Sequence, residues 1–139
     1  MTLDALYQAE ILELAKRGRA LKPLTDKTHS ARVDNPICGD RITVDLRVEE
    51  GVVTEIGAKV QGCALCQAAA GLIAETVTGD SPDALKVGAA EITGFLKTGD
   101  ELQSWGRLSA FAPVKDMKSR HECVLLPFWA AEKAMDQGT

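Results

Sequence analysis

The sequence predicts an α+β fold, in which a small, mostly antiparallel β-sheet packs against helices and carries a metal site at one end. Apolar residues alternate with polar ones between residues 41 and 60, a period that is typical of half-buried strands. On both sides of this segment, apolar residues recur at helical spacing. Three of the four cysteines, Cys38, Cys63 and Cys123, lie at the expected boundaries of these elements, where a metal site forms more readily than a core.

The length and composition are those of an ordinary globular protein. A chain of 139 residues can bury one real core, so we expect a single domain over residues 1–139. The net charge of −4 argues against a nucleic-acid partner. No run approaches the ~20 apolar residues that span a bilayer, and acidic residues near the N-terminus argue against a signal peptide. We therefore expect a cytoplasmic protein without a membrane partner. Thiols stay reduced in the cytoplasm, so the cysteines favour metal or redox chemistry over disulfides.

Periodicity and turn residues divide the chain into elements. The N-terminal half is predicted to contain a helix over residues 3–17, a polar loop over 19–37, and a hairpin of strands 41–49 and 52–60. The C-terminal half is predicted to contain a helix over 64–78, a third helix from Ser81-Pro82 to about Gly99, a mostly irregular segment over 100–120, and a last helix over 124–135.

The hairpin brings chemical groups together. In an antiparallel pair, the residue before the first strand and the residue after the second lie at the same end. Cys38, Asp40 and Cys63 should therefore be neighbours, and Cys123 precedes the last predicted helix. Thiolates and carboxylates are ligands of tetrahedral zinc and iron. We expect Cys38, Asp40, Cys63 and Cys123 to form a metal site with three sulfur ligands and one oxygen ligand.

These residues stand in a recognisable pattern. The string Asn35-Pro36-Ile37-Cys38-Gly39-Asp40, the pair Gly62-Cys63 that opens an alanine-rich helix, and Cys123 near the C-terminus together resemble the iron–sulfur cluster assembly scaffold family of IscU, NifU N-domains and SufU. The resemblance covers nearly the whole chain. The long segment between Gly79 and Cys123, and Arg120 within it, look closest to the SufU type.

The resemblance implies a SufE/NifU-like fold and a role in sulfur handling. A cysteine desulfurase of the SufS or IscS kind would deliver persulfide sulfur to one thiol. The chain would then either build a [2Fe-2S] or [4Fe-4S] cluster transiently for downstream carriers or scaffold proteins, or relay sulfur as a zinc-dependent sulfurtransferase. We expect zinc in the protein as isolated. Cys38 lies in a Pro/Gly turn and should be the most accessible thiol, so we predict it as the persulfide acceptor, with Cys123 as the alternative.

The sequence departs from the family pattern at two places. Glu122 stands before the last cysteine, where IscU-type proteins have histidine and SufU-type proteins usually have a basic residue. Cys66 is extra, and we expect it to be a small buried hydrophobe. His29 and His121 are expected in exposed loops, while Trp105 and Trp129 should pack in the core or on each other.

Two other functions fit parts of the pattern. A zinc nucleobase deaminase would use Cys38, an acid close after it, and the pair Cys63 and Cys66, but it requires Glu instead of Asp40 and would leave Cys123 idle. A thioredoxin-like redox protein would use Cys63 and Cys66, but such motifs follow a strand of a parallel βαβ unit. The alternating pattern favours an antiparallel hairpin instead.

Overall fold

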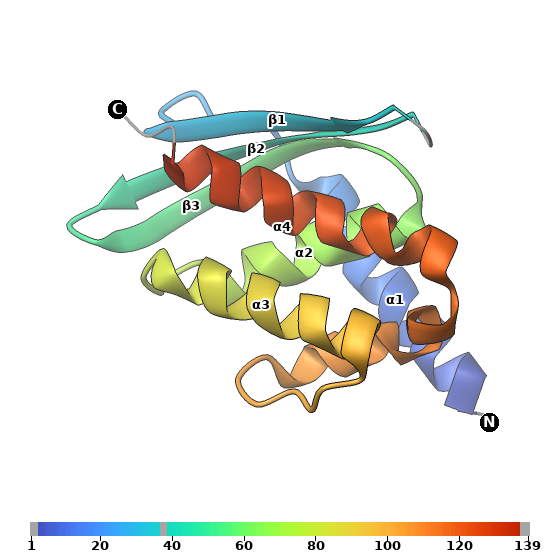
Figure 1. Cartoon of the computed structure of the whole chain (residues 1–139). Coiled ribbons are helices and arrows are strands. Elements are labelled where there is room, and N and C mark those ends of the chain that lie inside the picture. Colours follow the sequence, from blue (N-terminus) through green and yellow to red (C-terminus); the bar gives the residue numbers. More distant parts are fainter. Residues whose placement is uncertain (1–2, 37–38, 137–139) are drawn as a thin grey trace.

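The computed structural model describes residues 3–36 and 39–136 of the chain. Its three-stranded sheet has the order β1-β2-β3, and both strand pairs are antiparallel. Helices pack beside this sheet, so the predicted α+β class is confirmed (Figure 1). The elements are α1 (Leu3–Ala20), β1 (His29–Asn35), β2 (Asp40–Glu49), β3 (Val52–Gln61), α2 (Ala64–Val77), α3 (Asp83–Thr98), the 3-10 helices η1 (Gly106–Asp116) and η2 (Lys118–Arg120), and α4 (His121–Asp136).

The predicted hairpin is confirmed as β2 and β3. Its register pairs Arg41 with Gln61 at one end and Glu49 with Val52 at the other. Glu50 and Gly51 form the turn with positive φ angles of 52° and 78°. Such a two-residue turn matches the twist of the strands that it joins.

The predicted loop over residues 19–37 is wrong in its second half. Residues 29–35 form β1, which pairs with β2 from His29 opposite Leu46 to Asn35 opposite Asp40. The strand was missed because β1 lies at the edge of the sheet and its composition is mostly polar. His29 is consequently a strand residue, and its ring shares a hydrogen bond with the hydroxyl of Thr28.

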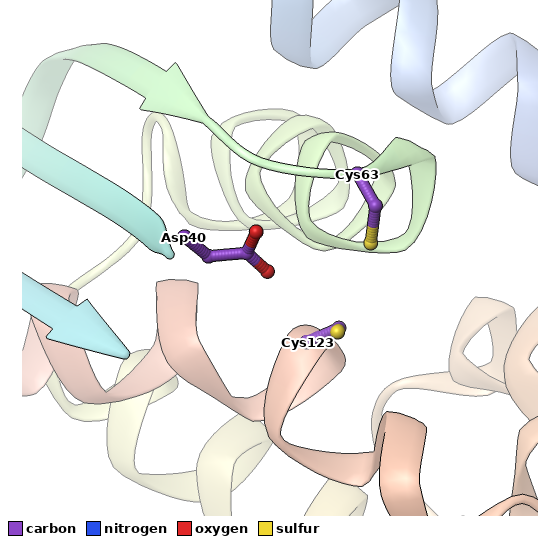
Figure 2. Close-up of side chains that lie close together, drawn as sticks. All are labelled: Asp40, Cys63 and Cys123. Carbon is purple, nitrogen blue, oxygen red and sulfur yellow. The ribbon is translucent and has the colours of Figure 1, made fainter. Parts of the chain in front are cut away.

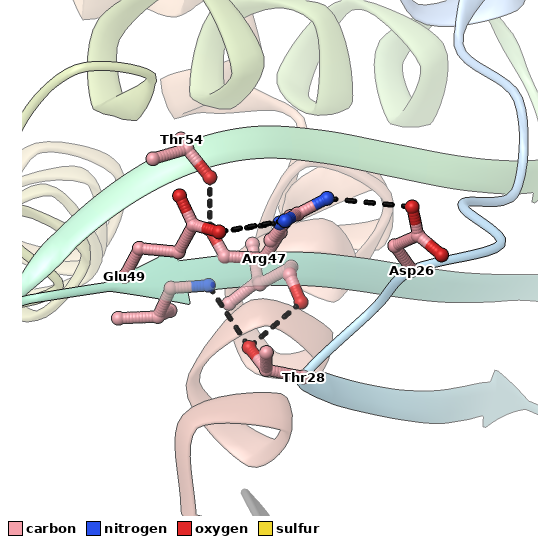
Figure 3. Close-up of polar contacts among 7 residues, drawn as sticks. Asp26, Thr28, Arg47, Glu49 and Thr54 are labelled. Carbon is pink, nitrogen blue, oxygen red and sulfur yellow. Dashed lines mark hydrogen bonds and ion pairs between the residues drawn. The ribbon is translucent and has the colours of Figure 1, made fainter.

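Polar contacts hold β1 in register at the end of the sheet where β2 finishes (Figure 3). The guanidinium of Arg47 donates to Glu49 at 2.7 Å and to Asp26 at 3.4 Å. The hydroxyl of Thr28 accepts the backbone N–H of Val48 at 2.9 Å. The chain is therefore tied to β2 just before β1 begins.

The core lies between the sheet and the helices. Ile42, Val44 and Leu46 alternate along β2 and are almost fully buried. Helix α4 packs against β1 and β2, and α2 packs against both α1 and α4 (Figure 1). Asp45 lies between these apolar residues in the sequence and is also buried, because residues 21–28 approach the sheet there. Its carboxylate accepts the N–H of Leu24 at 3.0 Å and the hydroxyl of Ser30 at 2.6 Å.

The segment over residues 100–120 is more regular than predicted. It contains the 3-10 helices η1 and η2, whose spacing of side chains differs from that of an α-helix. Trp105 is buried against Phe128, with ring centroids 5.6 Å apart, whereas Trp129 is exposed, contrary to the prediction. Helix α4 begins at His121, before the predicted start at residue 124, and so takes Cys123 into its first turn.

No helix within the described residues has the length and hydropathy of a membrane span.

The crossing of α1 and α2 provides a test of the packing that positions α2. A Cβ on Gly71 would lie 2.2 Å from the backbone oxygen of Leu14, so the two helices touch through their backbones. Gly71→Ala should lower the free energy of unfolding by about 1–3 kcal/mol, because the clash outweighs the better helix propensity of alanine. Gly106→Ala is the control, since a Cβ there meets nothing within 4 Å. Denaturant unfolding measures both variants, and equal stabilities would contradict the described crossing.

Candidate metal site

Three of the four predicted ligands converge in the structure. One ligand atom from each of Asp40, Cys63 and Cys123 lies within 4.8 Å of the other two. Figure 2 shows the Asp40 carboxylate directed toward the side on which the two sulfur atoms lie. Asp40 begins β2, Cys63 lies between β3 and α2, and Cys123 lies in the first turn of α4. Cys38 falls outside the described residues, so its place as a fourth ligand remains a prediction.

The sheet register brings Asp40 and Cys63 together. Asn35 pairs with Asp40 to close the β1–β2 connection, and the backbone N–H of Gly39 donates to the backbone carbonyl oxygen of Asn35 at 2.8 Å. Gly39 has a φ of 77°, a conformation that side chains rarely adopt. On the other strand, Arg41 pairs with Gln61, so the chain leaves β3 beside Asp40. The pairing of β2 with its two neighbours therefore brings these two ligands to the same end of the sheet.

Helix α4 supplies Cys123 and is tied to the same connection. The side-chain amide of Asn35 donates to the Glu122 carboxylate at 2.9 Å, and Asn35 is buried. Glu122 thus links the helix that carries Cys123 to the segment that carries Asp40. This contact gives a structural role to a residue that departs from the family pattern.

The Asn35–Glu122 contact yields a testable expectation. Glu122→Ala should weaken zinc binding by about tenfold, because partners that orient metal ligands typically contribute 10–100-fold to affinity. Glu122→Gln is the matched control, since its amide oxygen can still accept the Asn35 hydrogen bond and should largely preserve the affinity. Competition with a chromophoric chelator measures both. If the two variants bound zinc as tightly as the parent, the contact would have no role in positioning the site.

Two of the three grouped residues, Asp40 and Cys123, are buried. Asp40 is buried, and its Oδ2 has no hydrogen-bond partner among the described residues. Cys123 is buried as well; burial, with the negative charge of Cys63 second, raises the pKa of its thiol to about 12. A hydrogen bond from Arg120 acts in the opposite direction and lowers that pKa. A buried acceptor without a partner is costly unless another group satisfies it.

A divalent cation fits this environment. Coordination would satisfy Asp40 Oδ2 and would stabilise the ionised thiols, because a metal ion deprotonates the thiol that binds it. Two sulfurs and one oxygen are donors that zinc and iron accept, and these ligands leave a coordination position for which Cys38 is the predicted donor. Asp40, Cys63 and Cys123 are thus the described residues that could hold the ion.

Cys66 and His121 are both buried. Cys66 is fully buried, as predicted, but it also lies close to the site: burial raises its pKa, and Asp40, Cys63 and Cys123 raise it further. His121 is buried, so the predicted exposed loop position is wrong. Its Nε2 lies 3.0 Å from the backbone oxygens of both Val114 and Lys115, which places it in the packing of η1 against α4.

Asn35, Glu122 and Arg120 were not predicted as site residues. Asn35 opens the motif that contains Cys38 and Asp40, and its place in that motif is the sequence feature that could have identified it as a site residue. Nothing local in the sequence pairs Asn35 with Glu122, because the two residues are 87 positions apart in the chain.

The alternative functions fit the structure poorly. The strand that precedes Cys63 belongs to a sheet whose described strands all pair antiparallel, whereas a thioredoxin-like motif follows a strand of a parallel βαβ unit. A deaminase would bind its zinc through Cys63 and Cys66 together. Among the described residues, Cys63 is instead grouped with Asp40 and Cys123.

Comparisons with known proteins give a consistent assignment. The family model described as the NifU-like N terminal domain matches residues 6–123. The chain is 28% identical over 138 residues to the iron-sulfur cluster assembly scaffold protein IscU of Thermotoga maritima, covering 97% of this chain and 96% of that protein. It is 28% identical over 137 residues to the zinc-dependent sulfurtransferase SufU of Bacillus subtilis, covering 96% and 91%. The crystal structure of a NifU-like protein (N-terminal) from Brucella abortus has a TM-score of 0.88 and 31% identity, covering 97% and 95%.

Proposed function

This chain belongs to the NifU-like N-terminal domain family, and from that premise we propose that it accepts persulfide sulfur from a cysteine desulfurase at a metal site. In one version of this function the chain assembles the sulfur with iron into a cluster, and in the other it relays the sulfur onward. The observation that carries the proposal is the group of Asp40, Cys63 and Cys123, of which Asp40 and Cys123 are buried and whose ligand atoms lie within 4.8 Å of one another. The proposed site adds Cys38 as the third sulfur ligand. Relatives named as an IscU scaffold and as a zinc-dependent SufU sulfurtransferase support both versions of the function.

The proposed metal as isolated is zinc, at about one ion per chain. Zinc suits a tetrahedral set of thiolates and a carboxylate and survives exposure to air. When bound, it would hold the thiols ionised and ordered at neutral pH. The cargo of the site is sulfur, alone or together with iron as a [2Fe-2S] or [4Fe-4S] cluster.

The proposed sulfur transfer is an exchange between thiols. The thiolate of Cys38 attacks the terminal sulfur of a persulfide on the desulfurase, a new sulfur–sulfur bond forms on Cys38, and the desulfurase cysteine leaves as a thiolate. No net oxidation or reduction is required. Cys123 is the alternative acceptor, but its thiol is almost fully buried in the described structure, which favours Cys38.

One experiment tests the function and separates its two versions. The protein is purified without oxygen and incubated with iron(II), cysteine, a cysteine desulfurase and a dithiol reductant that converts persulfide sulfur to sulfide, and its zinc, iron and sulfide are measured. A scaffold should gain iron and sulfide in equal amounts, about two of each per chain for a [2Fe-2S] cluster. A relay should keep its zinc and carry sulfur without iron. Uptake of neither zinc, iron nor sulfur would contradict the proposed function.

Asp40 should control how readily a cluster leaves. Its carboxylate is a hard ligand among soft thiolates and is therefore the most easily exchanged. We expect Asp40→Ala to retain the fold and to release a reconstituted cluster several-fold more slowly to an apo-acceptor, because the exchangeable entry point is lost. Circular dichroism at visible wavelengths follows the transfer, with the unsubstituted protein as control. Faster loss of the cluster would mean that the oxygen ligand holds the cluster in place.

A further inference from the structure

We propose that Cys66 is a reserve metal ligand, which binds the ion when Asp40 is displaced and converts a site of three thiolates and one carboxylate into one of four thiolates. The inference rests on the proposed metal site and adds a residue to it. In this exchange a metal–oxygen bond breaks, a metal–sulfur bond forms, and the thiol proton passes to the released carboxylate or to water. No oxidant or reductant is needed.

The position of Cys66 relative to Asp40 carries the inference. The Sγ of Cys66 and the Cγ of Asp40 each lie 3.2 Å from the point that a Cβ on Gly62 would occupy. Because Gly62 has no side chain, no atom of Gly62 occupies that point. The thiol of Cys66 and the carboxylate of Asp40 therefore border the same space. Cys66 is fully buried, so the space toward Asp40 lies inside the protein and not on its surface.

The site also contains an independent sign of a ligand. Asp40 is only 9% exposed, and its Oδ2 has no hydrogen-bond partner among the described residues. The carboxylate of Asp40 is directed toward the side on which Cys63 and Cys123 lie (Figure 2). A buried ion would satisfy it, and the thiol of Cys66 is then a further soft donor beside that ion.

The described geometry explains why Cys66 is a reserve and not a standing ligand. Cys66 is absent from the group of ligand atoms that lie within 4.8 Å of one another, whereas Asp40 belongs to it. Cys66 lies in the first turn of α2, close after Cys63. We expect a rotation of its side chain, without movement of the helix, to bring its sulfur into the space that Asp40 leaves.

The chemical consequence follows from ligand softness. Four thiolates are the usual ligands of a stable iron–sulfur cluster and of structural zinc, whereas the carboxylate makes the site easier to open. Exchange between Asp40 and Cys66 would therefore switch one site between a releasing and a retaining state.

Cobalt(II) substitution tests the proposal, because thiolate-to-cobalt absorption grows with the number of bound thiolates. The unsubstituted chain, Asp40→Ala, Cys66→Ala and the double variant are each titrated with cobalt(II) without oxygen. We expect Cys66→Ala to match the unsubstituted chain. The absorption per bound cobalt should rise about 1.3-fold in Asp40→Ala, as three thiolates become four, and return to the starting value in the double variant. Asp40→Asn keeps the shape of the side chain and should show the same rise if the alanine variant folds poorly.

The outcomes distinguish the inference from the function on which it rests. If Asp40→Ala and Asp40→Asn bound cobalt with the absorption of the unsubstituted chain, or if the rise persisted in the double variant, Cys66 would not be the incoming ligand. In either case the proposed metal site would stand. If the unsubstituted chain bound no cobalt through thiolates, the metal site itself would be overturned, and the reserve ligand with it.

Discussion

Replacing Cys123 with serine should weaken zinc binding by more than about 100-fold, because the substitution removes a buried thiolate ligand. Residues that only orient ligands contribute about 10–100-fold to the affinity, and the loss of a ligand itself should exceed that effect. Cys63→Ser should have a similar effect, since both sulfurs belong to the described group. Competition with a chelator at fixed pH measures the affinity. Cys66→Ala is the control and should bind zinc like the unsubstituted chain. Parent-like affinity in Cys123→Ser would show that the described group is not the metal site.

The affinity of the protein for zinc should be lower at lower pH. Burial raises the pKa of Cys123 to about 12, so in the metal-free protein this thiol is protonated at pH 7. Zinc must displace that proton, and the apparent affinity should fall as the pH falls, by about tenfold per pH unit for each proton displaced. Calorimetry in buffers of different ionisation enthalpy would count the protons released. An affinity that is constant between pH 6 and pH 8 would contradict binding through protonated thiols.

Cys38→Ser should abolish the stimulation of a cysteine desulfurase by this protein. A persulfide acceptor must be a thiolate that the partner can reach, and Cys66 and Cys123 are both almost fully buried. Cys66→Ala is the matched control and should leave the stimulation nearly unchanged. Mass spectrometry after incubation with desulfurase and cysteine locates the added sulfur.

The location of that sulfur decides between the candidate acceptors. Sulfur on Cys38 would support the predicted assignment, and sulfur on Cys123 would support the alternative. Sulfur mainly on Cys66 would overturn both and would make Cys63 and Cys66 the working pair.

The sequence was sufficient for the parts of the fold that depend on neighbouring residues. Alternating apolar residues and the Glu50-Gly51 turn predicted β2 and β3, because hairpin pairing is local and its register follows from the turn. The neighbouring positions of Asp40 and Cys63 follow from that hairpin alone. Helix α2 was predicted for the same reason, from the helical spacing of its apolar residues and the glycine beyond its end.

Other features depend on contacts between distant parts of the chain. Strand β1 has a polar sequence and is held in place by pairing with β2, so its own residues do not reveal it. The start of α4 at His121 follows from the packing of that residue against η1. The approach of Cys123 to Asp40 and the contact of Asn35 with Glu122 arise when the helices pack on the sheet. Periodicity within a segment records which side of the segment is buried, but it does not record which distant residue that side meets.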